Sequence, residues 1–138
     1  MVVFIDTSSL IKRYVEETGS SEIDRYFTED TIVYISPLTP VEMNSALKRK
    51  LREGSISDET YRAAIGSWHE DVHSYSIVMF SDEIVSKAID IVNSHDVKTL
   101  DAFQISAAVL SGADESVTSD RQMHRVLEAI VNTRAVYI

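Results

Sequence analysis

The segment VFIDTSSLIKRY, from Val3 to Tyr14, joins a predicted strand to a predicted helix and places one acidic residue at the junction. Its first residues are apolar and largely β-branched, which is typical of a strand covered on both faces of a parallel sheet. Leu10, Ile11 and Tyr14 then recur at the three- to four-residue spacing of a helix. Asp6 follows the strand directly, so it can be the N-cap of the helix, a catalytic carboxylate, or both.

Short apolar runs of the same kind recur along the chain, separated by segments with helical spacing. The predicted strands are Val2–Ile5, Thr31–Ile35, Glu115–Thr118 and Ala135–Ile138. Further helices are predicted at Ile23–Phe27, Met43–Leu51, Tyr61–Tyr75, Ile84–Val92, Phe103–Ala113 and Met123–Ile130, with residues 57–112 wholly helical. Strands that alternate with helices predict a doubly wound α/β sandwich around a parallel sheet.

The composition limits the possible functions. The chain has 138 residues, which fits one domain with its own core. It has no Cys, no signal-peptide pattern and no apolar run near the roughly 20 residues of a membrane helix, so we expect a soluble cytoplasmic protein. The net charge is −9, so binding to nucleic acid would depend on metal ions or on local basic patches, such as Lys12–Arg13 and Lys48–Arg52.

Four carboxylates stand near the starts of predicted helices. Asp6 and Asp120 directly follow predicted strands, whereas Glu42 follows TIVYIS after the short link PLTP, and Asp101 opens the helix DAFQISAAVL. Ligands of open α/β sheets bind beyond the carboxyl ends of the strands. This rule brings at least two of the four acids to one edge of the sheet.

Each acid also has a purely structural explanation. Asp6 and Asp120 would accept hydrogen bonds from the free amides of a first helical turn. Glu42 fits a capping box with Thr39 as N-cap, and the helix dipole favours Asp101. Capping can equally use Ser, Thr or Asn, so the presence of a carboxylate at all four helix starts favours a shared role.

A cluster of these acids would require a cation. Carboxylates within about 5 Å of one another repel by roughly 3 kcal/mol per pair at an effective dielectric near 20. Oxygen ligands favour Mg²⁺ or Mn²⁺, which suit phosphoryl chemistry. The His69 and His73 pair lacks an HExxH motif and is better explained as a surface or core pair. The chain has no P-loop, dinucleotide or GxSxG motif.

Four segments resemble, in order, the successive acidic motifs of PIN-domain ribonucleases, particularly the VapC toxins of prokaryotic toxin–antitoxin pairs. They are IDTSSLIKRYVEETGS, ISPLTPVEMNSALKR, VKTLDAFQISAAVLSGAD and VTSDRQM, and they cover nearly the whole chain. The resemblance implies a three-layer α/β/α domain over residues 1–138 with a central parallel sheet. It also implies a homodimer and an antitoxin partner that covers the active site.

The same resemblance implies a site and a reaction. Mg²⁺ or Mn²⁺ would be held by Asp6, Glu42, Asp101 and Asp120, and a water activated by the metal would attack an RNA phosphodiester in line. Ser8 and Thr118 would support the acids. Gln104 departs from the family pattern, since many relatives have His at this position.

Basic residues for phosphate contact are less well defined. Arg13 and Arg49 each lie seven residues after an acid, Asp6 and Glu42 respectively, and so would share its helical face two turns on. A solvated helix end explains Arg49 equally well.

Two other kinds of protein with an acidic site at the edge of an α/β sheet require residues that this chain lacks. A phospho-accepting receiver module needs paired acids after the first strand, but Asp6 is followed by Thr7. A phosphatase of the haloacid dehalogenase type needs an acid two residues after Asp6, where the chain has Ser8. An inactive PIN-like binding module and a DNA nuclease of the same fold remain as alternatives.

Overall fold

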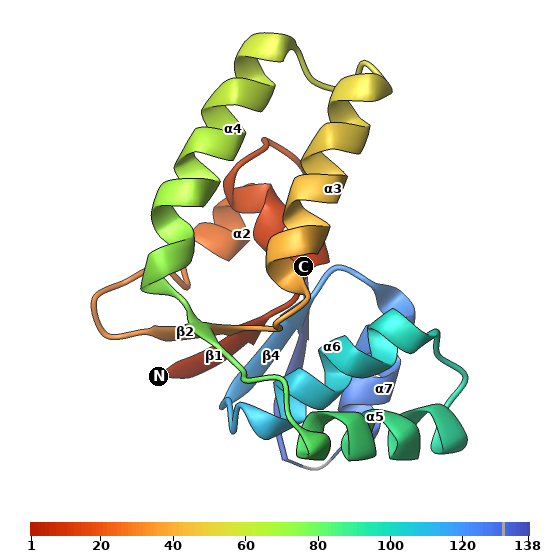
Figure 1. The fold of residues 1–138 in the computed structure, drawn as a ribbon. Coiled ribbons are helices and arrows are strands. Elements are labelled where there is room, and N and C mark those ends of the chain that lie inside the picture. The colour runs from red at the N-terminus through yellow and green to blue at the C-terminus, as the bar shows by residue number, and fades with distance from the viewer. Residues whose placement is uncertain (131) are drawn as a thin grey trace.

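A parallel sheet forms the centre of the molecule in the computed structural model, which describes residues 1–130 and 132–138 (Figure 1). The strands lie in the order β3-β2-β1-β4-β5, and every neighbouring pair is parallel. β1 is therefore central, between β2 and β4. The strands are β1 (Val2–Ile5), β2 (Ile32–Ile35), β3 (Ser76–Ile77), β4 (Glu115–Thr118) and β5 (Arg134–Tyr137).

Helices cover both faces of this sheet and give a three-layer α/β/α fold. The elements α1 to α4 pack on one face and α5 to α7 on the other (Figure 1). The helices are α1 (Thr7–Leu10), α2 (Ser20–Asp24), α3 (Thr39–Arg52), α4 (Asp58–Asp71), α5 (Asp82–Ser94), α6 (Thr99–Leu110) and α7 (Arg121–Ala129), with the 3-10 turns η1 (Ile11–Arg13) and η2 (Val72–Ser74).

Alternate residues of β1 belong to two separate hydrophobic cores. Val3 and Ile5 are fully buried in the first core, together with Met43 of α3 and Trp68 of α4. Phe4 is buried in the second core, against α5, α6 and α7. Because successive side chains of a strand point to opposite faces, a strand covered on both faces needs an apolar residue at every position.

The strand predictions are confirmed, with unchanged bounds for β1 and β4 and shifts of one residue for β2 and β5. The prediction that residues 57–112 are wholly helical is wrong, because β3 lies between α4 and α5 and pairs with β2. A strand of two residues is too short to show an alternating pattern. The segment Tyr61–Tyr75, predicted as one helix, is α-helical only as far as Asp71 and is followed by the 3-10 turn η2.

The helices α3 and α4 form a hairpin that extends away from the sheet (Figure 1). Trp68 anchors the hairpin, since its ring lies 5.8 Å from that of Tyr14 and 6.1 Å from that of Tyr75. Trp68 is 1% exposed and belongs to the first core, with Tyr61 and Tyr75 packed against it. None of the helices described is long and apolar enough to cross a membrane.

Candidate active site

Asp6 and Asp120 meet because their strands are neighbours. β1 and β4 run parallel in register, with Ile5 opposite Val117, so both strands end at the same edge of the sheet. The hydroxyl of Thr118 donates to Asp6 Oδ2 over 3.0 Å and accepts from the backbone N–H of Asp120, also over 3.0 Å. One threonine therefore joins the two acids through hydrogen bonds.

Asp6 is a buried carboxylate, 3% exposed, that caps α1. The backbone N–H of Ser9 donates to Oδ1 over 3.1 Å, and the Ser8 hydroxyl lies 2.8 and 2.9 Å from the two carboxylate oxygens. Burial, and to a smaller extent the charge of Asp120, raise the pKa of Asp6 to about 7, while the hydrogen bonds from Ser8, Ser9 and Thr118 act in the opposite direction. The prediction that Asp6 caps the helix is confirmed, and the pKa of the same carboxyl group is strongly raised.

Asp101 belongs to the same electrostatic group. It is the third residue of α6, not the first, and its side chain is half-buried. Burial raises its pKa and the charge of Asp120 adds to that effect, whereas Lys98 lowers it. Asp120 also caps α7, accepting from the N–H of Met123 over 2.8 Å. Its charge thus acts on both of the other aspartates.

Glu42 has hydrogen-bond partners that none of the three aspartates shares. The predicted capping box is wrong: α3 begins at Thr39 without a side-chain cap, because Glu42 bonds to other elements. Its Oε1 accepts from the hydroxyl of Thr7 over 3.3 Å and from the amide of Gln104. Glu42 is therefore held against α1 and α6 and does not close its own helix.

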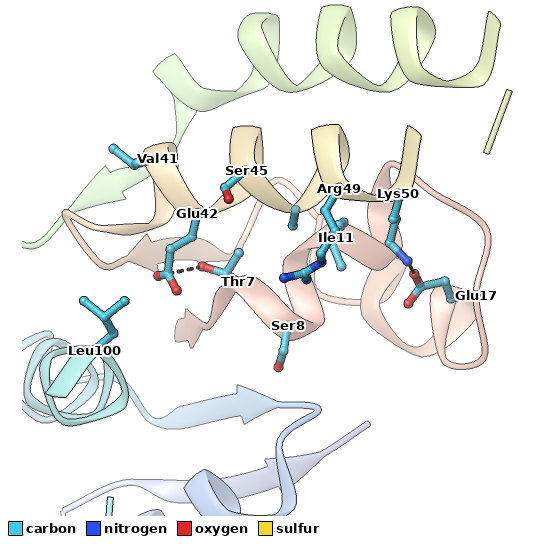
Figure 2. Close-up of a pocket in the computed structure, with 11 residues that line it drawn as sticks. Thr7, Ser8, Ile11, Glu17, Val41, Glu42, Ser45, Arg49, Lys50 and Leu100 are labelled. Atoms are coloured by element: carbon cyan, nitrogen blue, oxygen red, sulfur yellow. Dashed lines mark hydrogen bonds and ion pairs between the residues drawn. The ribbon is translucent and has the colours of Figure 1, made fainter. Parts of the chain in front are cut away.

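A cavity of about 580 Å³ extends from Glu42 along α3 (Figure 2). Thr7 and Ser8 form part of its floor, and the guanidinium of Arg49 reaches toward them from α3 in Figure 2. Lys50 also lines the cavity but forms an ion pair with Glu17. Arg49 is thus the better placed of these two cations for a phosphate in the cavity.

Arg13 does not line this cavity. Its guanidinium lies 3.3 Å from Asp24 Oδ1 and 3.5 Å from Asp71 Oδ2, and 4.0 Å above the ring of Phe27. The expected regular helix from Asp6 to Arg13 is wrong, because the chain changes to the 3-10 turn η1 after Leu10. A contact between Arg13 and RNA stays a prediction that the position of this side chain does not support.

The acids do not form a complete metal cage. Within residues 1–130 and 132–138, no group of three or more acidic or histidine side chains is arranged to hold a metal ion. The metal site of Asp6, Glu42, Asp101 and Asp120 that the resemblance implies therefore stays a prediction. The donors still fit Mg²⁺, which commonly binds through one or two carboxylates and completes its shell with water and substrate phosphate oxygens. The effect of Asp120 on the pKa values of Asp6 and Asp101 marks where such a cation would be favoured.

The sequence indicates no role for Thr7 in the site and shows Gln104 only as a departure from the family pattern. Both are buried and both bond to Glu42. Their spacing along the chain carries no signal for this contact, since Gln104 lies 62 positions from Glu42.

Comparisons with known proteins agree with this geometry. A family model described as PIN domain matches residues 3–128. A search of curated proteins finds no match. The fold is similar to that of VapC20 of Mycobacterium tuberculosis, described as a sarcin-ricin loop cleaving toxin (TM-score 0.69, 16% identity, 96% of this chain and 98% of that chain).

Two further solved structures share the fold. They are VapBC2 of Rickettsia felis bound to promoter DNA (TM-score 0.70, 12% identity, 100% of this chain and 99% of that chain) and PAE2754 of Pyrobaculum aerophilum (TM-score 0.65, 21% identity, 99% of this chain and 84% of that chain).

The raised pKa of Asp6 predicts that stability falls as pH rises in the absence of divalent metal. The folded state keeps a proton up to about pH 7, whereas the unfolded chain loses it near 3.8. The contribution is thus fully present below the unfolded pKa and is lost as pH rises through the folded pKa, with an upper limit of about 4 kcal/mol. Urea unfolding in EDTA between pH 4 and about 8 measures it. Asp6→Asn should flatten this dependence, and an equally steep dependence in the variant would contradict the assignment.

Proposed function

The chain belongs to the PIN-domain family, and on this premise we propose that it is a metal-dependent endoribonuclease, the toxin of a VapBC-type toxin–antitoxin pair. The observation that carries the proposal is the meeting of Asp6, Asp101 and Asp120 at the carboxyl edge of the sheet. Acids whose pKa values are raised by burial and by a neighbouring carboxylate, next to a cavity that Ser8 and Glu42 line, are typical of a functional site.

Each residue of the site would have its own role in the hydrolysis of the phosphodiester. PIN nucleases generally depend on divalent metal, and a bound Mg²⁺ or Mn²⁺ would polarise a phosphodiester and make an attacking water more acidic. Asp6, Asp101 and Asp120 would hold the ion. Ser8 and Thr118 fix the Asp6 carboxylate through the hydrogen bonds described above. Glu42, at the wall of the cavity, would complete the ligand set or accept the proton of the water.

RNA is the proposed substrate because the structurally similar VapC20 is described as cleaving the sarcin-ricin loop. Arg49 would bind a phosphate of the strand in the cavity. A DNA nuclease would replace this proposal if the purified protein cleaved DNA and not RNA, and an inactive binding module would replace it if the protein cleaved neither.

The proposed antitoxin would cover the cavity. Several similar structures are toxin–antitoxin complexes, among them one from Klebsiella pneumoniae. We expect a small partner protein to bind this chain tightly and to inhibit RNA cleavage when the purified proteins are mixed. Full RNA cleavage by the stoichiometric complex would contradict this expectation.

The proposed homodimer would use an apolar patch made by Phe80, Ile89, Val92 and Phe103. Phe80, Ile89 and Val92 are 58%, 55% and 46% exposed, and the ring of Phe80 stacks on that of Phe103 at 5.7 Å. Ile89, Val92 and Phe103 also line one shallow pocket between α5 and α6. Contiguous apolar surface of this kind marks interaction sites on soluble proteins.

Replacing single aspartates tests the nuclease assignment. Asp6→Asn, Asp101→Asn and Asp120→Asn should each lower the rate of RNA cleavage in Mn²⁺ by about 100-fold or more, as the loss of one preorganised electrostatic group does elsewhere. Asp90→Asn, on the exposed surface of α5, serves as the matched control and should cleave normally. Structured RNA, single-stranded RNA and DNA should be compared under the same conditions. Near-normal RNA cleavage by all three variants would exclude the proposed site.

Replacing Arg49 tests the placement of the substrate. Arg49→Ala should weaken RNA binding about tenfold and lower the slope of log Kd against log salt by about one, because one phosphate contact is lost. Fluorescence anisotropy on an Asp120→Asn background measures binding without cleavage. Arg52→Ala is the control, since Arg52 is exposed on the same helix but does not line the cavity. Equal effects of the two substitutions would argue for a diffuse field and against a defined contact.

Replacing Ile89 tests the proposed dimer. Ile89→Glu should convert a dimer to a monomer in sedimentation velocity, because a charge would be buried in an apolar contact. Ile32→Glu is the control, since Ile32 is 54% exposed but lies outside the patch, on β2. A wild-type protein that sediments as a monomer at micromolar concentration would refute the dimer.

A further inference from the structure

A buried polar cluster lies behind Glu42, at the point where α1, α3 and α6 meet. Thr7 belongs to α1, Thr39 to α3 and Gln104 to α6, and their exposed fractions are 9%, 0% and 2%. Buried polar side chains reduce stability unless their hydrogen bonds are made. The hydrogen-bond partners of these side chains therefore indicate the role of the cluster.

The donors of the cluster converge on one oxygen of Glu42. The amide nitrogen of Gln104 donates to Oε1, and the hydroxyl of Thr7 lies 3.3 Å from the same atom. Gln104 Nε2 also lies 3.2 Å from Thr7 Oγ1 and 3.5 Å from Thr39 Oγ1. Among the residues described, no side chain bonds to the other oxygen, Oε2, and Glu42 lines the 580 Å³ cavity.

The contact between Gln104 and Glu42 lowers the stability of the fold, because it leaves the other polar atom of the amide unpaired. Its carbonyl oxygen, Oε1, is buried and has no hydrogen-bond partner among the described residues. A buried acceptor left without a partner typically costs about 1–3 kcal/mol. Turning the amide over would not help, because a carboxylate only accepts and would then face the amide oxygen. The contact with Glu42 therefore fixes the orientation of the amide and leaves its oxygen unpaired.

We propose that Gln104 is a positioning residue which, with Thr7, ties down one oxygen of Glu42 and leaves only the other free to act in the cavity. The proposal rests on the nuclease function inferred above, since it deepens the role of Glu42 in that site. A neutral amide is suited to this task because it orients the carboxylate without cancelling its charge, as Lys or Arg would. Glu42 then offers one oxygen, enough for a single water or a single bond to a cation.

Two substitutions at position 104 separate positioning from packing. Gln104→Leu keeps a similar volume, removes the donor and removes the unpaired oxygen, so we expect the melting temperature to be unchanged or higher. Its kcat for RNA should fall about 10- to 100-fold, the cost of misplacing a reacting group by roughly 1 Å, with KM within about twofold of wild type. Gln104→His restores an N–H donor and should recover most of the lost kcat.

Ser106→Ala is the matched control on the same helix. Ser106 is 0% exposed, and its hydroxyl donates to the Ile84 carbonyl over 2.7 Å, away from the cavity. This variant loses a buried hydrogen bond, so its melting temperature should fall while kcat stays unchanged. A kcat of Gln104→Leu within about twofold of wild type, or no recovery in Gln104→His, would overturn the proposal.

Crystal structures of the wild-type protein and Gln104→Leu decide the question without RNA. The proposal expects one Glu42 rotamer in the wild type and a rotated or divided side chain in the variant. An unchanged Glu42 in the variant would overturn the role of Gln104 even if the protein is a ribonuclease. Conversely, a wild-type protein that cleaves no RNA would refute the proposed function, and the Glu42 rotamers would still decide whether Gln104 positions this carboxylate.

Discussion

The candidate site depends on a buried carboxyl group at the end of the central strand. Asp6 is almost fully buried, and its raised pKa shows that the hydrogen bonds from Ser8, Ser9 and Thr118 do not fully offset burial. An Asn at this position could also accept from the Ser9 amide and cap α1. The fold therefore needs a capping oxygen here, but it does not need the charge. An ionisable side chain at a position where its ionisation costs stability is best explained by chemistry at the site.

Local features of the chain were predictable because they depend on neighbouring residues. The apolar runs at β1 and β4 mark strands covered on both faces, and an acid directly after each run marks a cap. The parallel order of the two strands then brings Asp6 and Asp120 together. These three steps need only the period of a strand, the chemistry of a helix N-terminus and the rule that parallel strands end at one edge.

Glu42 and Arg13 show where such reasoning fails. The spacing from Thr39 to Glu42 satisfies a capping box, but Thr7 and Gln104 bond to Glu42 from 35 and 62 positions away. Arg13 and Arg49 have the same spacing from an acid, yet only α3 is a continuous helix over that interval. Helix continuity and long-range partners are tertiary properties, which a local pattern does not contain.

In the proposed nuclease, the charges around the cavity would link metal binding to substrate binding. The carboxylates at the sheet edge would repel a phosphate, and Lys50 is paired with Glu17. Arg49 adds one positive charge at the wall of the cavity in a chain of net charge −9. A divalent cation among the acids would cancel two of their negative charges, so the bound ion would raise the affinity for RNA. Because such coupling is reciprocal, RNA would raise the affinity for the ion by the same factor. An incomplete protein cage is consistent with this arrangement, since the substrate phosphate would supply ligands that the protein lacks.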